Sequence, residues 1–177
     1  MLKLIDAEEK YLKGYQEAFL LSLDKVKSGE MNERNLVFND LETVDIIQKS
    51  KDHRDVTKLK PNRVLSYDYF AVDEEKFVGV IHIRVELNAN LYKIGGHIGY
   101  GVNPKYWKLG YGTEILRLGL IKAKDIIKDN DVLITCDDNN IGSARIIEKN
   151  GGILENKITN QDEYGEVITR RYWIKLR

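Results

Sequence analysis

The sequence predicts a mixed α/β domain in which helices flank a mostly antiparallel β-sheet, and three observations support this prediction. An amphipathic helical pattern occupies the start of the chain. From Arg63 on, the pattern changes to the alternating or continuous apolar runs of strands. Later, the order strand, helix, strand indicates two parallel strands joined by a crossover helix. The length of 177 residues is that of one domain with a sizeable core.

Helices are predicted first, at residues 8–26 and 41–48. In the longer one, apolar side chains recur at spacings of three and four between lysines and acids, which is the pattern of an amphipathic helix. These side chains are Tyr11, Leu12, Tyr15, Phe19, Leu23 and Val26. The segment 49–63 is polar and weakly periodic and contains Pro61, so we predict an exposed loop.

Strands are predicted next, at residues 63–72, 76–87 and 95–102, with a turn between the first two. An antiparallel meander should result. A helical stripe of apolar residues then runs through 115–127, and a short buried strand follows at 131–136.

The last part of the chain predicts a short helix and a hairpin. The helix lies within residues 139–152, where Asn139 or Asn140 can cap its beginning and Gly151 can end it. Two final strands, 152–159 and 166–176, flank a turn-rich segment and should pair with each other.

Charge and cysteine content narrow the classes of partner. Lys plus Arg number 28 and Asp plus Glu also number 28, so no net charge attracts nucleic acid or an anionic membrane. Basic residues in the segment 49–60 alternate with acids, which also disfavours nucleic acid. The single cysteine, Cys136, excludes an internal disulfide and a multi-cysteine zinc site. With no signal-peptide pattern and no apolar run that could span a bilayer, we expect a cytoplasmic protein.

The stretch "PKYWKLGYGTEIL", residues 104–116, places Gly110 and Gly112 between a predicted strand and a predicted helix. One interpretation is a tight turn that needs the backbone freedom of glycine. The other is an anion site, because helix N-termini present unpaired N–H groups and glycine lets a phosphate come close. The Walker loop and the dinucleotide fingerprint are disfavoured, since Thr113 and Ile115 stand where those motifs need other residues.

Two motifs in this order resemble the GNAT superfamily of CoA-dependent N-acetyltransferases. In that family, a strand ending in Val-x-Pro leads to Gln/Arg-x-x-Gly-x-Gly/Ala, and an Asn-x-x-Ser/Ala helix ending in Glu-Lys-x-Gly follows. This chain matches them at Val102, Pro104, Gly110 and Gly112 and then at Asn140, Ser143, Glu148, Lys149 and Gly151. The resemblance covers roughly residues 63–177. In detail, this part of the sequence is similar to a subgroup of predicted bacterial acetyltransferases.

The resemblance implies a single GNAT domain over residues 1–177, with a twisted, mixed but mostly antiparallel sheet of about six to seven strands flanked by helices. Residues 1–62 would form the substrate-side helices and loop, 63–152 the acetyl-CoA-binding core, and 153–177 a C-terminal hairpin. The implied activity moves an acetyl group from acetyl-CoA to a primary amine of a small molecule or peptide, without a metal. Relatives often form homodimers.

Cofactor-binding residues are implied around the glycine turn and the next helix. They are Tyr100, Val102, Trp107, Lys108, Leu109, Gly110, Tyr111, Gly112, Thr113, Asn140 and Ser143. Trp107 stands where the family usually has Gln or Arg. This difference should weaken cofactor binding little, because the groups that donate hydrogen bonds to the phosphates are backbone N–H groups. Ile147 stands where many relatives carry a tyrosine that protonates the departing thiolate, so this acid cannot be carried over.

For catalysis, the resemblance implies direct attack of the amine on the thioester. The backbone N–H of Tyr100 would polarise the carbonyl if the strand 95–102 bulges away from its neighbour, which Gly99 and Gly101 permit. His97 is the candidate base, because an ordinary histidine pKa near ~6.5 suits proton transfer and the family often places its base on this strand. A structural histidine is the alternative. Cys136 is expected in the core, and an acyl-cysteine role is the less favoured alternative.

Four further residues are candidates for the substrate side. His82, Arg84 and Glu86 share one face of the strand 76–87, and Asp137 follows the strand 131–136. The alternatives are a polar sheet face for the first three and a solvated acid for the fourth.

Two other classes of function stay open. One is a GNAT-like domain that binds acyl-CoA without catalysis, which the isoleucine at position 147 suggests. The other is a protein-interaction domain in which the glycines only form a turn. The sequence does not identify the acceptor amine.

Overall fold

The strands form two sheets in the structure, which is a computed structural model and describes residues 1–176. The first sheet has the order β1-β2-β3-β4 and the second has the order β5-β7-β6, and all neighbouring strands are antiparallel. Their bounds are β1 Leu2–Ile5, β2 Ser66–Asp73, β3 Lys76–Arg84, β4 Ile98–Val102, β5 Asp131–Asp137, β6 Ile153–Asp162 and β7 Gly165–Lys175. The predicted mixed α/β class is confirmed.

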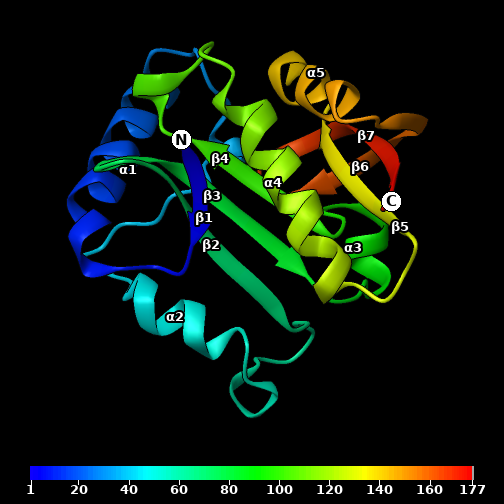
Figure 1. The fold of residues 1–177 in the computed structure, drawn as a ribbon. Coiled ribbons are helices and arrows are strands. Elements are labelled where there is room, and N and C mark those ends of the chain that lie inside the picture. Colours follow the sequence, from blue (N-terminus) through cyan, green and yellow to red (C-terminus); the bar gives the residue numbers. More distant parts are fainter. Residues whose placement is uncertain (177) are drawn as a thin grey trace.

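Five α-helices and four 3₁₀ turns connect the strands. They are α1 Leu12–Lys27, α2 Ile46–Asp52, α3 Ala89–Lys93, α4 Tyr111–Ile126 and α5 Ile141–Lys149, with η1 Glu9–Tyr11, η2 Glu33–Asn35, η3 Val56–Lys58 and η4 Pro104–Tyr106. Figure 1 shows α4 crossing in front of the first sheet, with α1 and α2 at its margins and α5 above the second sheet. Within residues 1–176, no helix is long and apolar enough to cross a membrane.

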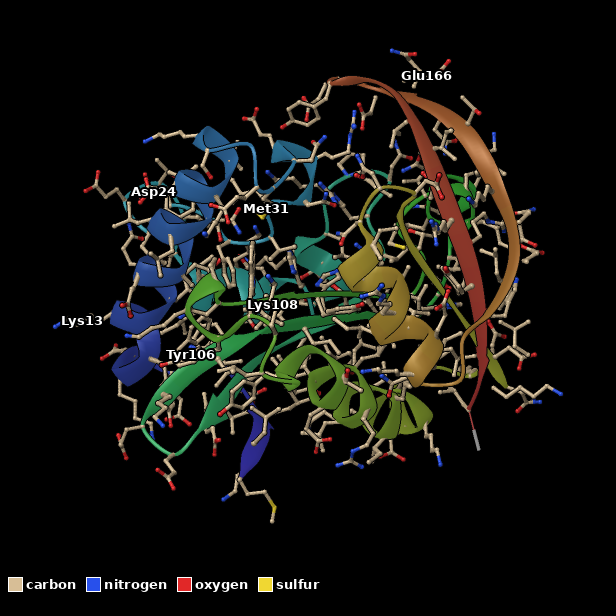
Figure 2. All side chains as sticks on the ribbon, turned by 90° about the horizontal axis from the view of Figure 1, so that it is seen from above. Lys13, Asp24, Met31, Tyr106, Lys108 and Glu166 are labelled. Carbon is tan, nitrogen blue, oxygen red and sulfur yellow. The ribbon has the colours of Figure 1, made fainter. Side chains whose placement is uncertain are left out.

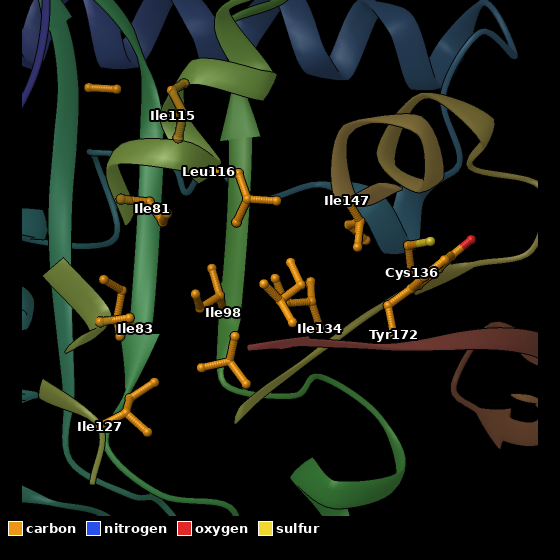
Figure 3. Packing of buried hydrophobic residues seen from close by; sticks show 14 of the residues in the cluster. Ile81, Ile83, Ile98, Ile115, Leu116, Ile127, Ile134, Cys136, Ile147 and Tyr172 are labelled. Carbon is orange, nitrogen blue, oxygen red and sulfur yellow. The ribbon is translucent and has the colours of Figure 1, made fainter. Parts of the chain in front are cut away.

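Two apolar clusters cover the two faces of the first sheet. The main cluster joins β3 and β4 to α4, and Figure 3 shows Ile81, Ile98, Ile115 and Leu116 within it. The second cluster is rich in aromatic rings, with Tyr15 of α1 packed against Phe70 and Phe77. These clusters fix α4 on one face and α1 on the other, because each helix buries its apolar stripe against the sheet.

The two sheets separate between β4 and β5, which were predicted to be parallel neighbours. One backbone hydrogen bond joins their beginnings, from the His97 N–H to the Leu133 carbonyl (2.7 Å). Beyond it, within the described residues, each strand is the edge of its own sheet. The β3–β4 register contains no shift, so the predicted bulge in β4 does not cause this opening.

Local sequence patterns located most elements but missed some. Strand β1 and helix α3 were not predicted, because four or five residues are too few for a periodic pattern to be recognised. Helix α2 begins later than expected, since Asp45 caps it by accepting a hydrogen bond from the Gln48 N–H (2.9 Å). The second half of α2 and the turn η3 therefore lie in the segment predicted as a loop.

Candidate functional site

A cavity of about 940 Å³ opens beside the free edge of β4. It is bounded by β4, the first turns of α4 and α5, and the segment 29–38 that follows α1. Figure 2 shows three of its lining residues, Met31, Tyr106 and Lys108, between α1 and α4. This volume lies near the upper end of the range for small-molecule sites, so the cavity can hold a large organic ligand.

Helix α4 begins at a turn with left-handed backbone angles. Gly110 is the N-cap residue and has a φ of 86°, and Lys108 has a φ of 63°. A Cβ atom built on Gly110 would meet no atom within 4 Å, so the space beside this residue is open to the cavity. Because the first N–H groups of a helix have no partner within the helix, this turn is suited to hold an anion.

Gly112 has a different surrounding. A Cβ atom at this position would lie 2.5 Å from Cδ1 of Ile146 and 3.4 Å from Cγ2 of Val102. Its lack of a side chain therefore lets α4 approach α5 and β4. The left-handed backbone of Gly110 fits the tight-turn interpretation, while the anion site stays a prediction.

Cationic side chains surround the same end of the cavity. Lys108 precedes α4, and Arg145 and Lys149 lie one turn apart on α5; all three line the cavity. None of them forms an ion pair with another of the residues 1–176. They are therefore available to a negatively charged ligand. Sequence analysis did not single out Arg145, although its spacing of four from Lys149 on a helix places it on the same face.

The predicted cofactor residues gather at this cavity with one exception. Leu109 does not line it, and its side chain is exposed to solvent because the left-handed turn directs it outward. The lining members are Tyr100, Val102, Trp107, Lys108, Gly110, Tyr111, Gly112, Thr113, Asn140 and Ser143. Trp107 has a structural role as well, since its indole N–H donates to the Val102 carbonyl (2.8 Å).

The first turn of α5 is held by Asn140. Its side-chain oxygen accepts a hydrogen bond from the Ser143 N–H (3.1 Å), so Asn140 is the N-cap residue. The amide nitrogen of Asn140 is not used by this cap and can donate to a ligand. The Ser143 hydroxyl lies 2.9 Å from the hydroxyl of Tyr100, which links α5 to β4 across the cavity wall.

Residues 32–153, which contain β4, α4 and α5, match the acetyltransferase (GNAT) domain family. The chain belongs to the GNAT family. A search of curated protein sequences gave no match.

Solved structures of GNAT proteins share the fold over nearly the whole chain. One is the microcin C7 self-immunity acetyltransferase in complex with acetyl-CoA and AMP, with 16% identity, coverage of 98% and 92% of the two chains, and a TM-score of 0.68. Another is the Salmonella typhimurium enzyme that modifies the N-terminal serine of ribosomal protein L7/L12 (17%, 98% and 94%, 0.69). A third is a Vibrio cholerae spermidine N-acetyltransferase chimera (12%, 99% and 95%, 0.65). These identities show a common fold alone.

Two positions of this GNAT protein are core residues rather than reactive groups. Ile147 is fully buried, and Figure 3 shows it beside Cys136 and Tyr172. Burial raises the pKa of the Cys136 thiol to about 11, so little thiolate exists at neutral pH. The structure therefore favours the predicted core role of Cys136 over an acyl-enzyme.

The Tyr100 side chain is a functional candidate that sequence analysis missed, because it considered only the backbone of this residue. The hydroxyl lies in the cavity wall and contacts Ser143. Burial raises the pKa of Tyr100 above the ordinary tyrosine value, so the hydroxyl stays protonated and can donate a hydrogen bond.

Backbone N–H groups of β4 face the opening between the sheets. The Asn103 N–H donates to the Val78 carbonyl of β3 (2.8 Å). Because N–H directions alternate along a strand, those of Tyr100 and Val102 point to the other edge, toward β5. This edge is not paired with another strand of the described chain, which leaves donors for a carbonyl group.

The structure contradicts the prediction that His97 is the base. His97 has only 1% of its surface exposed and does not line the cavity. Its Nδ1 accepts a hydrogen bond from the Leu133 N–H (3.0 Å), and its Nε2 lies 3.9 Å from Asp129. The structural alternative fits this geometry, because the ring holds the beginnings of β4 and β5 together.

None of the four substrate-side candidates, His82, Arg84, Glu86 and Asp137, is among the residues that line the cavity. Arg84 donates to the carbonyls of Gly95 (3.1 Å) and Gly96 (2.9 Å), which holds the turn before β4. Burial lowers the pKa of Arg84 to about 10, so it remains charged at neutral pH. Glu86 is exposed beyond the end of β3.

Asp137 stays a substrate-side candidate. It ends β5, and its Oδ2 is buried without a hydrogen-bond partner among residues 1–176. Burial raises the pKa of this carboxyl, and the nearest cation is Arg34, with Nε 4.0 Å from Oδ2. An unsatisfied buried carboxylate oxygen at the opening between the sheets can accept a hydrogen bond from an amine.

His82 is joined to Asp68 and His53 in a cluster on the sheet face that α1 and α2 border. Among residues 1–176, this cluster is the one group of three histidine, cysteine or acidic side chains whose arrangement could hold a metal ion. The expectation that no metal is needed stays a prediction.

Proposed function

We propose that this protein is an acetyl-CoA-dependent N-acetyltransferase that moves the acetyl group directly to a primary amine. The observation that carries the proposal is one cavity bordered both by the glycine turn at the start of α4 and by the unpaired N–H groups of β4. This arrangement fits a long ligand with phosphates at one end and a carbonyl at the other. Acetyl-CoA supplies such a carbonyl as a thioester.

The anion end would bind the pyrophosphate. Backbone N–H groups from Gly110 to Gly112 would donate to the phosphate oxygens, and Lys108, Arg145 and Lys149 would add positive charge. The side-chain amide of Asn140 would donate to the pantetheine arm.

The reacting end would use groups of β4. The Tyr100 N–H would donate to the thioester oxygen as negative charge develops there. The amine nitrogen forms a bond to the carbonyl carbon, the carbon–sulfur bond breaks, and the amine loses a proton. The Tyr100 hydroxyl is proposed to donate a hydrogen bond to the departing thiolate, which leaves without the acid that Ile147 cannot supply.

The acceptor is proposed to be an amine of a small molecule or of a peptide. Support comes from two relatives of the same fold, one acting on an N-terminal serine and one on spermidine. We also propose a cytoplasmic location, because the only cysteine, Cys136, is a free thiol. A homodimer stays a prediction, which light scattering can check.

Calorimetry with acetyl-CoA and a thiol-release assay test the proposal. The assay would use two amines, spermidine and a peptide that begins with serine. We expect binding of acetyl-CoA and release of free CoA with at least one amine. Binding without release would favour the acyl-CoA-binding domain that lacks catalysis. Absence of binding would overturn the proposal and favour a protein-interaction domain.

A further inference from the structure

Three polar side chains from distant parts of the sequence meet on the sheet face opposite α4. Asp68 comes from β2, His82 from the neighbouring strand β3, and His53 is the C-cap residue of α2. Nδ1 of His53 lies 2.6 Å from Oδ2 of Asp68, and Nδ1 of His82 contacts the other oxygen, Oδ1. The side chains are 28% to 31% exposed, so the cluster is accessible from solvent.

The cluster holds both imidazole rings in one tautomer. Burial would raise the pKa of Asp68, but hydrogen bonds from His53 and His82 outweigh burial and lower it well below the ordinary value. Asp68 is therefore ionised and accepts hydrogen bonds from both Nδ1–H groups. The Nε2 atom of each ring then carries the free lone pair, as in a catalytic His–Asp pair.

Burial, with a smaller contribution from nearby cations, keeps His82 neutral near pH 7. Burial lowers the pKa of His82, and Asp68 opposes this effect only in part. Arg84 on the same strand and His53 of α2 lower it further. Arg54, which donates to the Asp68 carbonyl (3.3 Å), also borders the cluster. A neutral imidazole with a free Nε2 can take up a proton.

His82 lies beside the strand that borders the cavity. It pairs with Gly99 across β3 and β4, and a Cβ atom on Gly99 would meet nothing within 4 Å. The next two residues along β4, Tyr100 and Gly101, line the cavity. His82 is not itself among the lining residues, and the open space beside Gly99 lies between its strand position and the edge where the proposed thioester would lie.

The short contacts in the cluster favour protons over a metal ion. A zinc ion holds nitrogen and oxygen ligands at about 2.0 to 2.2 Å, which places tetrahedral ligand atoms about 3.3 Å apart. The Asp68 oxygens lie closer than this to both Nδ1 atoms. The separation of His53 and Asp68 is that of a short hydrogen bond.

We propose that His82 takes the proton from the acceptor amine, with Asp68 and His53 as positioning residues. The inference rests on the proposed acetyltransferase function. As the nitrogen attacks the thioester carbon, its proton passes to Nε2 of His82, directly or through one water, and then to solvent. The contact of its Nδ1 with Asp68 leaves Nε2 of the neutral His82 ring unprotonated before each turnover.

Kinetics of His82→Gln test the proposal, with spermidine and the serine-initiated peptide as acceptors. We expect kcat to fall by ~100-fold to ~10,000-fold, with unchanged acetyl-CoA affinity and a loss of the acidic limb of the pH profile. Asp68→Asn should shift the acidic limb of the pH profile, because it changes the hydrogen bond at Nδ1 of His82. His97→Gln is the matched control, since it removes a buried histidine that accepts from the Leu133 N–H, and it should retain the acidic limb.

Several results would overturn the assignment of His82. Near-normal kcat in His82→Gln would exclude it as the base. Loss of wild-type activity in a chelator with recovery in zinc would replace proton transfer by a metal site. If His82→Gln does not fold, nitrogen NMR of the wild type decides, because an Nε2–H tautomer would contradict the proposal. Failure of both amines with bound acetyl-CoA would instead reject the catalytic function itself.

Discussion

At the scale of single residues, the cavity depends on where side chains are missing. Gly110 combines a left-handed backbone with open space, whereas Gly112 is packed against Ile146. A side chain at position 110 would enter the ligand space, while one at position 112 would push on α5. A substitution at position 110 should therefore affect ligand binding, and one at position 112 should affect the packing of α4 against α5.

Gly110→Asn should weaken acetyl-CoA binding by about tenfold or more, which is about 1.4 kcal/mol. Asparagine tolerates the left-handed conformation, so the fold should persist while the side chain obstructs the anion site. Calorimetry measures the affinity. Gly151→Asn is the matched control, because Gly151 has a φ of 87° and no neighbour within 4 Å but lies outside the cavity lining. Equal affinity in both variants would place the phosphates elsewhere.

His97→Gln should reduce the free energy of unfolding by about 1 to 3 kcal/mol, because the Leu133 N–H loses a buried acceptor. Burial, opposed in part by Asp129, lowers the pKa of His97, so the unfolded chain binds a proton at a pH where the folded chain does not. Stability is therefore complete above about pH 6.5 and is lost as the pH falls below that value.

Thermal melting of wild type and His97→Gln between about pH 8 and pH 5.5 checks this dependence. The wild-type Tm should fall more steeply, although His82 contributes a similar loss in both proteins. Parallel curves would show that His97 does not titrate differently on folding.

At the scale of elements, the first turn of α5 combines capping with the cavity wall. Asn140 accepts from the Ser143 N–H through its oxygen, and Ser143 contacts the Tyr100 hydroxyl. The helix start and the proposed pantetheine contact therefore use different atoms of one side chain.

Asn140→Asp should separate these two roles. Aspartate caps helices as well as asparagine does but has no amide donor, so the Tm should be retained. The KM for acetyl-CoA should rise roughly tenfold, the effect of one lost hydrogen bond of about 1.4 kcal/mol. Steady-state kinetics and melting curves measure both. An unchanged KM would leave Asn140 with the cap alone.

Strand β4 is shaped by its contact with the segment before α2. A Cβ atom on Gly101 would lie 1.9 Å from Cγ2 of Val37, so Gly101→Ala should cost about 1 to 3 kcal/mol. Adding Val37→Ala should restore most of the loss, because only a 3.1 Å contact would remain. Gly99→Ala, with no atom within 4 Å, should be nearly neutral. Urea denaturation compares these variants, and additive losses in the double variant would contradict the contact.

At the scale of the whole molecule, the segment that covers the cavity joins the two sheets. Arg34, in the turn η2, forms a bidentate pair with Asp162 at the end of β6, with distances of 3.1 and 3.0 Å. This contact spans 128 residues of sequence. It ties the segment 29–38 to the second sheet across the cavity.

Arg34→Lys should loosen this connection while keeping the charge, because lysine cannot form the bidentate pair. Amide hydrogen exchange in residues 30–38, followed by mass spectrometry, should become faster. Arg117→Lys is the matched control, since Arg117 forms a similar pair with Glu114 inside α4. Equal exchange in both variants would show that the Asp162 contact does not order this segment.

The sequence by itself determined the periodic elements and the ligand motif. Helix α1, strands β2 and β3 and the final hairpin follow from spacings within one segment, where each apolar side chain must reach the same face. The residues of the glycine turn and of the Asn140 helix were located in the same way, because their contacts with the cavity are made close to their own backbone.

Only the tertiary structure decided which distant groups meet. Strand β1 exists because β2 pairs with it, and the His97 ring joins the beginnings of β4 and β5, beyond which the two sheets separate. His53, Asp68 and His82 carry no common motif, yet strand register and the end of α2 bring them onto one carboxylate. Such contacts depend on how separate elements pack, and periodicity within one segment contains no information on the neighbour across the sheet.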